Sequence, residues 1–207
     1  MGEIMKKILI LGATGLFGKE LIKKLREINE YKIVAFSRHA KDFYSDDEIL
    51  TSVNGDATKE ADLISAMNDV ETVYCAISGD GLPKVADNLV NIMAKVNISR
   101  LIFMGAVGIY NEIPVELDDA DNVRNNPEQI INLKAVRIIE NSNLNYTIIR
   151  PGYLQEGNEN DYVLTFRNEQ SKGYISSISS VVNFAVKLIA DEKLYSCQNI
   201  AITKKQL

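Results

Sequence analysis

Three glycines spaced three residues apart stand near the start of the chain, in the segment Gly12-Ala13-Thr14-Gly15-Leu16-Phe17-Gly18. The first allows a tight turn, the second lets a pyrophosphate approach the backbone, and the third allows close helix packing. The segment follows an apolar run at 7–11 and precedes a helical pattern, so free N–H groups at the helix start would face an anion. In this strand–loop–helix context the spacing predicts a site for the pyrophosphate of a dinucleotide. The alternative is a simple tight turn.

The residues at the end of the second predicted strand indicate which dinucleotide is bound. An Asp or Glu there would bind the ribose 2′-OH and repel a 2′-phosphate. This sequence has Ser37-Arg38 instead, with Lys41 close by. A hydroxyl beside a guanidinium suits a phosphate, because Arg offers fixed, charge-assisted donors. The prediction is therefore NADP(H) rather than NAD(H). The alternative is that Arg38 is a solvated loop residue, and the single histidine, His39, is expected to be a surface residue or a minor contact to the adenosine phosphate.

Alternating apolar runs and helical patterns must position these residues. Strands are predicted at 7–11, 32–36, 50–53, 72–77, 101–104 and 146–149, and helices at 16–28, 59–67, 82–96 and 179–190, before a last segment at 199–203. Asn126-Pro127 is expected to give an N-cap and a first helical proline for a further helix to about Asn141.

Strands separated by helices predict an α/β fold with a doubly wound parallel sheet, the Rossmann fold, in a single domain spanning 1–207. Ligands of such folds bind in a crevice at the carboxyl ends of the strands. Two less regular stretches, 107–125 and 152–173, follow strand ends and are expected to be the substrate-side loops.

Composition narrows the classes of partner. The 207 residues carry a formal net charge of −5, so the chain lacks the excess of positive charge that would indicate binding to nucleic acid or to an anionic membrane. A small molecule or another protein is the expected partner. Neither a signal peptide nor a membrane-spanning stretch is expected, and Cys75 and Cys197 are expected to be reduced thiols in apolar surroundings. The expectation is a soluble cytoplasmic protein.

The sequence resembles the atypical short-chain dehydrogenase/reductases, specifically the NmrA-like and NAD(P)H-binding reductase-like proteins, over nearly the whole chain. The motifs that carry the resemblance are the glycine loop, Ser37-Arg38, Gly55-Asp56-Ala57, Ala76-Ile77-Ser78-Gly79, Lys134 and Tyr146-Thr147-Ile148-Ile149-Arg150-Pro151-Gly152.

This resemblance implies a role for each cofactor-binding segment. Asp56 and Ala57 should lie at the adenine ring, and Ala76–Gly79 should pass along the cofactor ribose. Pro151-Gly152-Tyr153 should approach the nicotinamide side. The turn preference of an Asp after Gly55 leaves open that Asp56 is only a turn residue.

The sequence departs from this family where the catalytic hydroxyl groups are expected. Members with full dehydrogenase chemistry carry a Ser at the end of the fifth strand, and a Tyr and a Lys one helical turn apart, for proton transfer to or from the carbonyl. Here the fifth strand ends at Met104-Gly105-Ala106, and Ile130 stands four residues before Lys134. Lys134 shares a helix face with Ile130 and could still reach the ribose. Proton relay by the usual mechanism is not expected, and no catalytic residue is assigned.

Other polar residues give weaker indications. Tyr110 and Tyr153 border the expected crevice and could replace the missing phenol, or could simply pack against the core. The acidic residues of 107–125 are expected to form a solvated lid, since the glycine and distal Glu of a calcium loop are absent. The acids at 42–48 are likewise expected to be solvated. The sequence has no Cys/His cluster with metal-ligand spacing, so no metal site is predicted.

Two functions remain after these considerations. The first is an NADP(H)-dependent reductase of a small acceptor such as a quinone, a flavin or a conjugated carbonyl, which would take its proton from solvent. The second is a non-catalytic NADP(H)-sensing module of NmrA-like type that signals to a protein partner through loop order at 107–125 or 152–173. An epimerase or dehydratase comes third, because those activities also depend on the absent Tyr.

Overall fold

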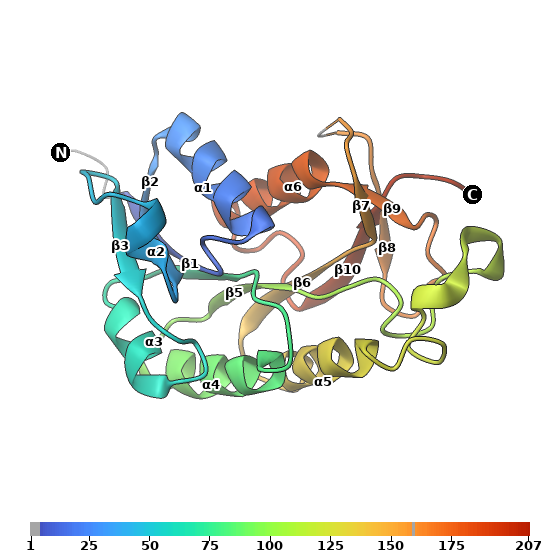
Figure 1. The fold of residues 1–207 in the computed structure, drawn as a ribbon, viewed down its shortest axis with the longest axis horizontal. Coiled ribbons are helices and arrows are strands. Elements are labelled where there is room, and N and C mark those ends of the chain that lie inside the picture. The colour runs from blue at the N-terminus through green and yellow to red at the C-terminus, as the bar shows by residue number, and fades with distance from the viewer. Residues whose placement is uncertain (1–4, 159) are drawn as a thin grey trace.

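The chain alternates strands and helices along most of its length in the computed structural model, which describes residues 5–158 and 160–207 (Figure 1). The first part comprises β1 (Lys6–Leu11), α1 (Leu16–Ile28), β2 (Tyr31–Ser37), α2 (Ala40–Phe43), β3 (Leu50–Asn54), α3 (Glu60–Ala66), β4 (Thr72–Cys75), α4 (Leu82–Lys95) and β5 (Arg100–Met104). The second part comprises the 3-10 turns η1 (Val115–Leu117) and η2 (Asp119–Asp121), then α5 (Gln129–Glu140), β6 (Asn145–Pro151), β7 (Tyr153–Gln155), β8 (Val163–Phe166), β9 (Ile175–Ser177), α6 (Ile178–Ala190) and β10 (Gln198–Thr203).

Eight of the strands form one sheet in the order β3-β2-β1-β4-β5-β6-β10-β8. Neighbours from β3 to β10 pair in parallel, and β8 pairs antiparallel with β10 at the edge. A separate parallel pair joins β7 to β9. The order reverses between β1 and β4, as the doubly wound Rossmann arrangement requires. The predicted fold class is confirmed.

Side-chain alternation along the strands fills two cores, one on each face of the sheet. From β1, Ile8 and Ile10 pack in the core under α1 and α6, whereas Leu9 and Leu11 pack in the core over α3, α4 and α5. The two helical layers lie on opposite sides of the sheet in Figure 1. Because helices cover both faces of the sheet, its strands are apolar on both sides. The carboxyl ends of the parallel strands remain open to a ligand.

One predicted helix start is wrong. Helix α5 begins at Gln129, with Glu128 as its N-cap, and not after an N-cap at Asn126. The side chain of Asn126 instead accepts a hydrogen bond from the Glu128 N–H (3.1 Å), while the Pro127 carbonyl accepts one from Ile130 (3.0 Å). The Asn-Pro pair therefore forms a separate turn that leads into the helix.

The structure also differs from the sequence-based expectation in two other regions. The range 152–173, expected to be irregular, contains β7 and β8, which are too short for a periodic pattern to reveal. Both cysteines are free, and Cys75 is buried as expected, but Cys197 is exposed at a positive φ of 55°. Within the described residues, the helices are too short or too polar to cross a membrane.

Candidate cofactor-binding site

The glycine loop between β1 and α1 is held against β2 by its own backbone. The N–H groups of Gly12 and Ala13 both donate to the carbonyl oxygen of Phe36 (3.1 Å each). Gly12 has a φ of +81°, which favours glycine. A Cβ at Gly18 would overlap the carbonyl oxygen of Gly12, so the close approach of α1 to the loop requires glycine there too.

The amino terminus of α1 offers backbone donors to a ligand. Gly15 is the N-cap, and within 12–18, all of which the structure describes, no side chain caps the helix and no acidic residue occupies its first turn. The first N–H groups of a helix have no partner within it, and the helix dipole favours negative charge at this end. The loop therefore fits the pyrophosphate of the predicted dinucleotide.

A cavity of about 500 Å³ opens beside this loop, at the carboxyl ends of β1, β2, β3 and β4. It brings together most of the predicted cofactor-binding residues: Gly12, Thr14, Gly15, Ser37, Arg38, Asp56, Ala57, Ala76, Ile77 and Ser78. The remaining wall is formed by Phe36, His39, Gly55, Thr58, Asp80, Gly81 and Val85. The cavity thus lies where ligands of doubly wound sheets bind.

Arg38 forms the positively charged end of this cavity, which Asp56 and Asp80 also line. It is exposed, and no ion pair involves it among the described residues. The hydroxyl of Ser37 lies next to it and accepts a weak hydrogen bond from the His39 N–H (3.4 Å). The imidazole of His39 faces Asp42 (3.5 Å between Nδ1 and Oδ2). A guanidinium and a hydroxyl are therefore available here to an anionic group.

The wall formed by Asp56 and Ala57 is fixed by neighbours that the sequence did not reveal. Thr58 donates both its N–H (2.9 Å) and its hydroxyl (2.8 Å) to the carboxylate of Asp56, and these bonds lower the pKa of Asp56. The Asp56 N–H donates to Asp62 (2.9 Å), and the buried Asn88 of α4 donates to the Ala57 carbonyl (3.1 Å). The turn role left open for Asp56 is thus present, alongside its place in the cavity wall.

The other predicted residues lie outside this cavity. Ala13, Phe17 and Gly18 support the loop, Leu16 is exposed at the start of α1, and Gly79 lies in the chain after β4. Lys134 is exposed on α5. Pro151 and Gly152 are held at the end of β6, where the Val107 N–H donates to the Pro151 carbonyl (2.9 Å) and the Gly152 N–H donates to the Ser176 hydroxyl (2.8 Å). Tyr153 is 59% exposed.

The positions without hydroxyl groups lie near the ends of β5 and α5. Gly105 follows β5 directly, and its N–H donates to the carbonyl of Ile149 (2.8 Å). A Cβ at Gly105 would contact Val136 and Arg150 at 3.2–3.3 Å. Ile130 is exposed in the first turn of α5, one turn before Lys134.

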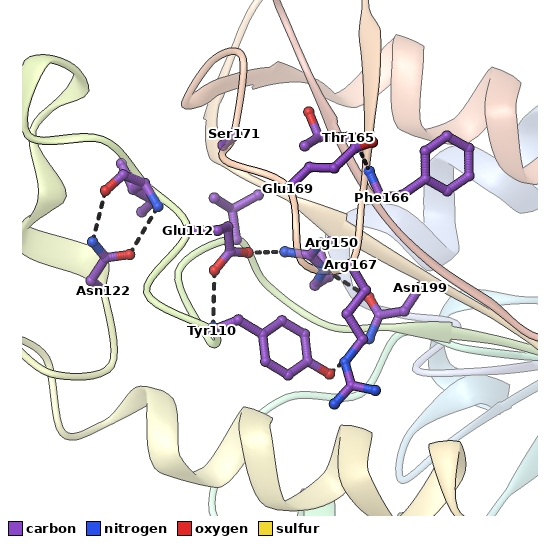
Figure 2. A network of polar contacts seen from close by, with 12 residues as sticks. Tyr110, Glu112, Asn122, Arg150, Thr165, Phe166, Arg167, Glu169, Ser171 and Asn199 are labelled. Carbon is purple, nitrogen blue, oxygen red and sulfur yellow. Dashed lines mark hydrogen bonds and ion pairs between the residues drawn. The ribbon is translucent and has the colours of Figure 1, made fainter.

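Tyr110 points into a network of polar side chains and not into open space (Figure 2). Its ring lies between the guanidinium groups of Arg150 (5.3 Å) and Arg167 (5.0 Å), and its hydroxyl accepts a hydrogen bond from Asn199 (2.9 Å). Burial and the nearby carboxylate of Glu140 raise the pKa of Tyr110. The packing role expected as the alternative for Tyr110 is the one observed.

The acidic loop after β5 is only in part the solvated lid that its composition suggested, because Glu116 and Asp118 are exposed but the other acids have protein partners. Glu112 is buried and forms an ion pair with Arg150. Asp119 pairs with Arg124, and the carboxylate of Asp121 accepts a hydrogen bond from the Tyr174 hydroxyl. The acids of 42–48 are all exposed, as expected, and Asp46 also accepts hydrogen bonds from the Ser52 N–H (2.7 Å) and hydroxyl (2.6 Å), which lower its pKa. Among the described residues there is no cluster of His, Cys, Asp and Glu that could hold a metal ion.

Comparison with known proteins places this geometry among NAD(P)-binding proteins. A family described as NAD(P)H-binding matches residues 12–192. A short-chain dehydrogenase/reductase from Veillonella parvula, solved in complex with NADP, is 26% identical with a TM-score of 0.86, over 97% of this chain and 95% of that one. A Rossmann-fold NAD(P)-binding protein from Shigella flexneri is 30% identical with a TM-score of 0.80, over 97% and 94%.

ChuY from Escherichia coli O157:H7, described as an anaerobilin reductase, shares the fold at 18% identity and a TM-score of 0.81, over 98% of each chain. At that identity the likeness shows the fold alone. No curated protein matches the sequence significantly.

Proposed function

The chain belongs to the NAD(P)H-binding family, and we propose that it is an NADP(H)-dependent reductase of a small acceptor. The observation that carries the cofactor preference is the charged end of the cavity. Ser37, the last residue of β2, and Arg38, which follows it, line this end, where an acidic residue would favour NAD(H). The Veillonella relative with bound NADP supports this choice of cofactor.

Each part of the site has a role in this proposal. The N–H groups at the start of α1 hold the pyrophosphate, Arg38 and Ser37 hold the 2′-phosphate, and Asp56 and Ala57 border the adenine. We further propose that Lys134 binds the nicotinamide ribose and that Pro151-Gly152-Tyr153 lie on the nicotinamide side. When bound, the cofactor supplies a hydride.

The acceptor class follows from the groups that are missing. Neither Gly105 nor Ile130 carries a hydroxyl, and the Tyr110 hydroxyl is held within the network of Figure 2, so of the two tyrosines that could replace the missing phenol the exposed Tyr153 remains. An acceptor that gains a hydride and then takes its proton from water needs no such group. A quinone reduced to its hydroquinone is one example, and a flavin or a conjugated carbonyl is another.

A second function is favoured by the same missing hydroxyl groups. A protein that only binds NADP(H) and signals its redox state to a protein partner would need neither of them. The two proposals differ in turnover. With NADPH bound, we expect oxidation above the buffer rate by menadione, FMN or an enone; binding without turnover across this panel would refute the reductase and leave the sensor.

The cofactor preference is tested by Arg38→Ala with fluorescence titrations of NADPH and NADH. Charge-assisted hydrogen bonds to a phosphate are worth about 1.5–3 kcal/mol, so NADPH affinity should fall roughly tenfold or more while NADH affinity changes little. Lys95→Ala, at the far end of α4, controls for the loss of one positive charge. Equal losses of affinity for NADPH and for NADH would remove the argument that the protein prefers NADP(H).

A further inference from the structure

The ion pair between Glu112 and Arg150 is nearly completely enclosed by protein (Figure 2). Arg150 lies in β6 and is fully buried, and Glu112, from the loop after β5, is 7% exposed. Besides the ion pair, each of the two side chains makes a hydrogen bond that fixes its orientation. The other carboxylate oxygen of Glu112 accepts from the Tyr110 N–H (2.9 Å), and Nε of Arg150 donates to the side-chain oxygen of Asn199 (2.7 Å).

Asn199 extends the network to the end of α5. Its amide nitrogen donates to the Tyr110 hydroxyl and to the carboxylate of Glu140 (2.9 Å each). Together with the bond from Arg150, three hydrogen bonds therefore fix the orientation of the Asn199 side chain. Arg167, after β8, approaches the same carboxylate (3.4 Å between Nε and Oε1). Because every member is held by others from different elements, the direction of the Arg150 side chain is fixed by the fold.

Stability alone does not account for such a pair. Removing two charges from water costs free energy that their attraction barely offsets, and apolar side chains of similar volume often serve the fold as well. What charged and hydrogen-bonded groups add is a unique orientation of the segments that carry them. The informative question is therefore which segments this pair orients.

The pair joins the two segments that follow β5 and β6. Arg150 stands next to Pro151, the last residue of β6, and Glu112 follows the turn at 107–110. A backbone bond reinforces the connection, since the Val107 N–H donates to the Pro151 carbonyl (2.9 Å). The carbonyl of Glu112 is held by a third segment, because it accepts from the N–H of Ser171 between β8 and β9 (2.8 Å). These segments lie beyond the cavity that takes the adenosine part of the cofactor.

We infer that Glu112 and Arg150 are positioning residues, which hold the segments after β5 and β6 in fixed register so that acceptor and nicotinamide meet between them. Neither residue touches the reacting atoms. The inference rests on the proposed reductase function. Chemical steps of this kind are sensitive to placement, because a displacement of about 1 Å can cost a hundredfold in rate.

The test removes both charges together, because a single substitution leaves its partner buried without a counter-ion and can prevent folding. In Glu112→Gln/Arg150→Met, the amide oxygen still accepts from Tyr110 and the thioether chain fills the space. We expect a thermal midpoint close to that of the native protein and an unchanged Kd for NADPH. We expect kcat with menadione to fall at least tenfold. Native midpoint and native kcat together would overturn the inference.

A matched control removes another ion pair from the same molecule. Arg26 of α1 pairs with Asp47 (2.6 Å) in the connection between β2 and β3, and both groups are partly exposed. Arg26→Met/Asp47→Asn should leave kcat and the NADPH Kd at native values. A fall in kcat as large as that of the Glu112/Arg150 variant would show that the effect is not specific to the buried pair, and would also overturn the inference.

A second readout separates failure of the inference from failure of the proposed function. Amide hydrogen exchange of 105–113 and 150–155, measured with NADPH bound, should be at least severalfold faster in the Glu112→Gln/Arg150→Met variant. If the native protein reduces no acceptor, the reductase proposal fails while this measurement still reports on positioning. Exchange at the native rate in both segments would refute the positioning role whatever the activity.

Discussion

At the scale of single residues, Gly15 and Gly18 of the phosphate loop have different roles. A Cβ at Gly18 would overlap Gly12 and lie 2.8 Å from the Cα of Ala13, whereas a Cβ at Gly15 would meet only the Gly12 oxygen at 3.2 Å. Gly15 also has an ordinary φ of −78°. Gly18 is thus required by the fold itself, and Gly15 chiefly by access of a ligand to the helix start.

This difference predicts separable effects of two small substitutions. Gly18→Ala should lower the free energy of unfolding by about 1–3 kcal/mol through overpacking, and it should weaken NADPH binding as the loop shifts. Gly15→Ala should leave stability within about 0.5 kcal/mol of native yet weaken NADPH binding, because its methyl group occupies the approach of the pyrophosphate. Urea unfolding and NADPH titration measure the two quantities. Equal stability losses in both variants would contradict this assignment.

At the scale of elements, the loop between β5 and α5 is tied down at several points. The buried side chain of Asn122 both accepts from and donates to the backbone of Ile113 (3.0 and 2.8 Å), as Figure 2 shows. The Tyr174 hydroxyl donates to Asp121, and the Tyr174 carbonyl accepts from the Tyr153 N–H (2.7 Å). Tyr174 therefore connects this loop with β7, the strand that follows the predicted nicotinamide side.

Loss of that connection should be measurable. Tyr174→Phe keeps the ring but removes the donor to Asp121, so the free energy of unfolding should fall by about 1–2 kcal/mol. Amide exchange in 119–126 should become faster. Tyr162→Phe is the matched control, since its hydroxyl accepts from the exposed Lys187 (3.1 Å) outside the loop. Native exchange rates in 119–126 for the Tyr174 variant would show that the loop is held by its other bonds alone.

Local patterns predicted the elements that build the cavity beside the glycine loop, because its walls lie at the carboxyl ends of β1, β2, β3 and β4. The same patterns could not reveal Asn88 or Asp62, since their bonds to the cavity wall arise from helix packing. In the sequence, Glu112 cannot be distinguished from the other acidic residues of a polar loop. Its burial is determined by Arg150, a partner that only the tertiary fold brings near.

At the scale of the whole molecule, the cavity and the buried polar network lie over different strands of the sheet. The cavity proposed to bind the adenosine part of the cofactor lies over β1 to β4, and the buried network lies beyond it, over β6 and β10. Because no residue of the network lines the cavity, cofactor affinity and the geometry of the acceptor side should respond independently to substitution.

Ligand-induced stabilisation tests this separation in the intact protein. NADPH at about a hundredfold excess over its Kd should stabilise the folded state by about 2.7 kcal/mol. For a chain of this length that corresponds to a rise in thermal midpoint of about 5–10 °C. NADH at the same concentration should give a smaller rise. Arg38→Ala should abolish the difference between the two cofactors, whereas Glu112→Gln/Arg150→Met should retain it in full. Loss of the difference in the second variant would show that the network and the cavity are coupled, because a cofactor can only shift an equilibrium between states that it binds differently.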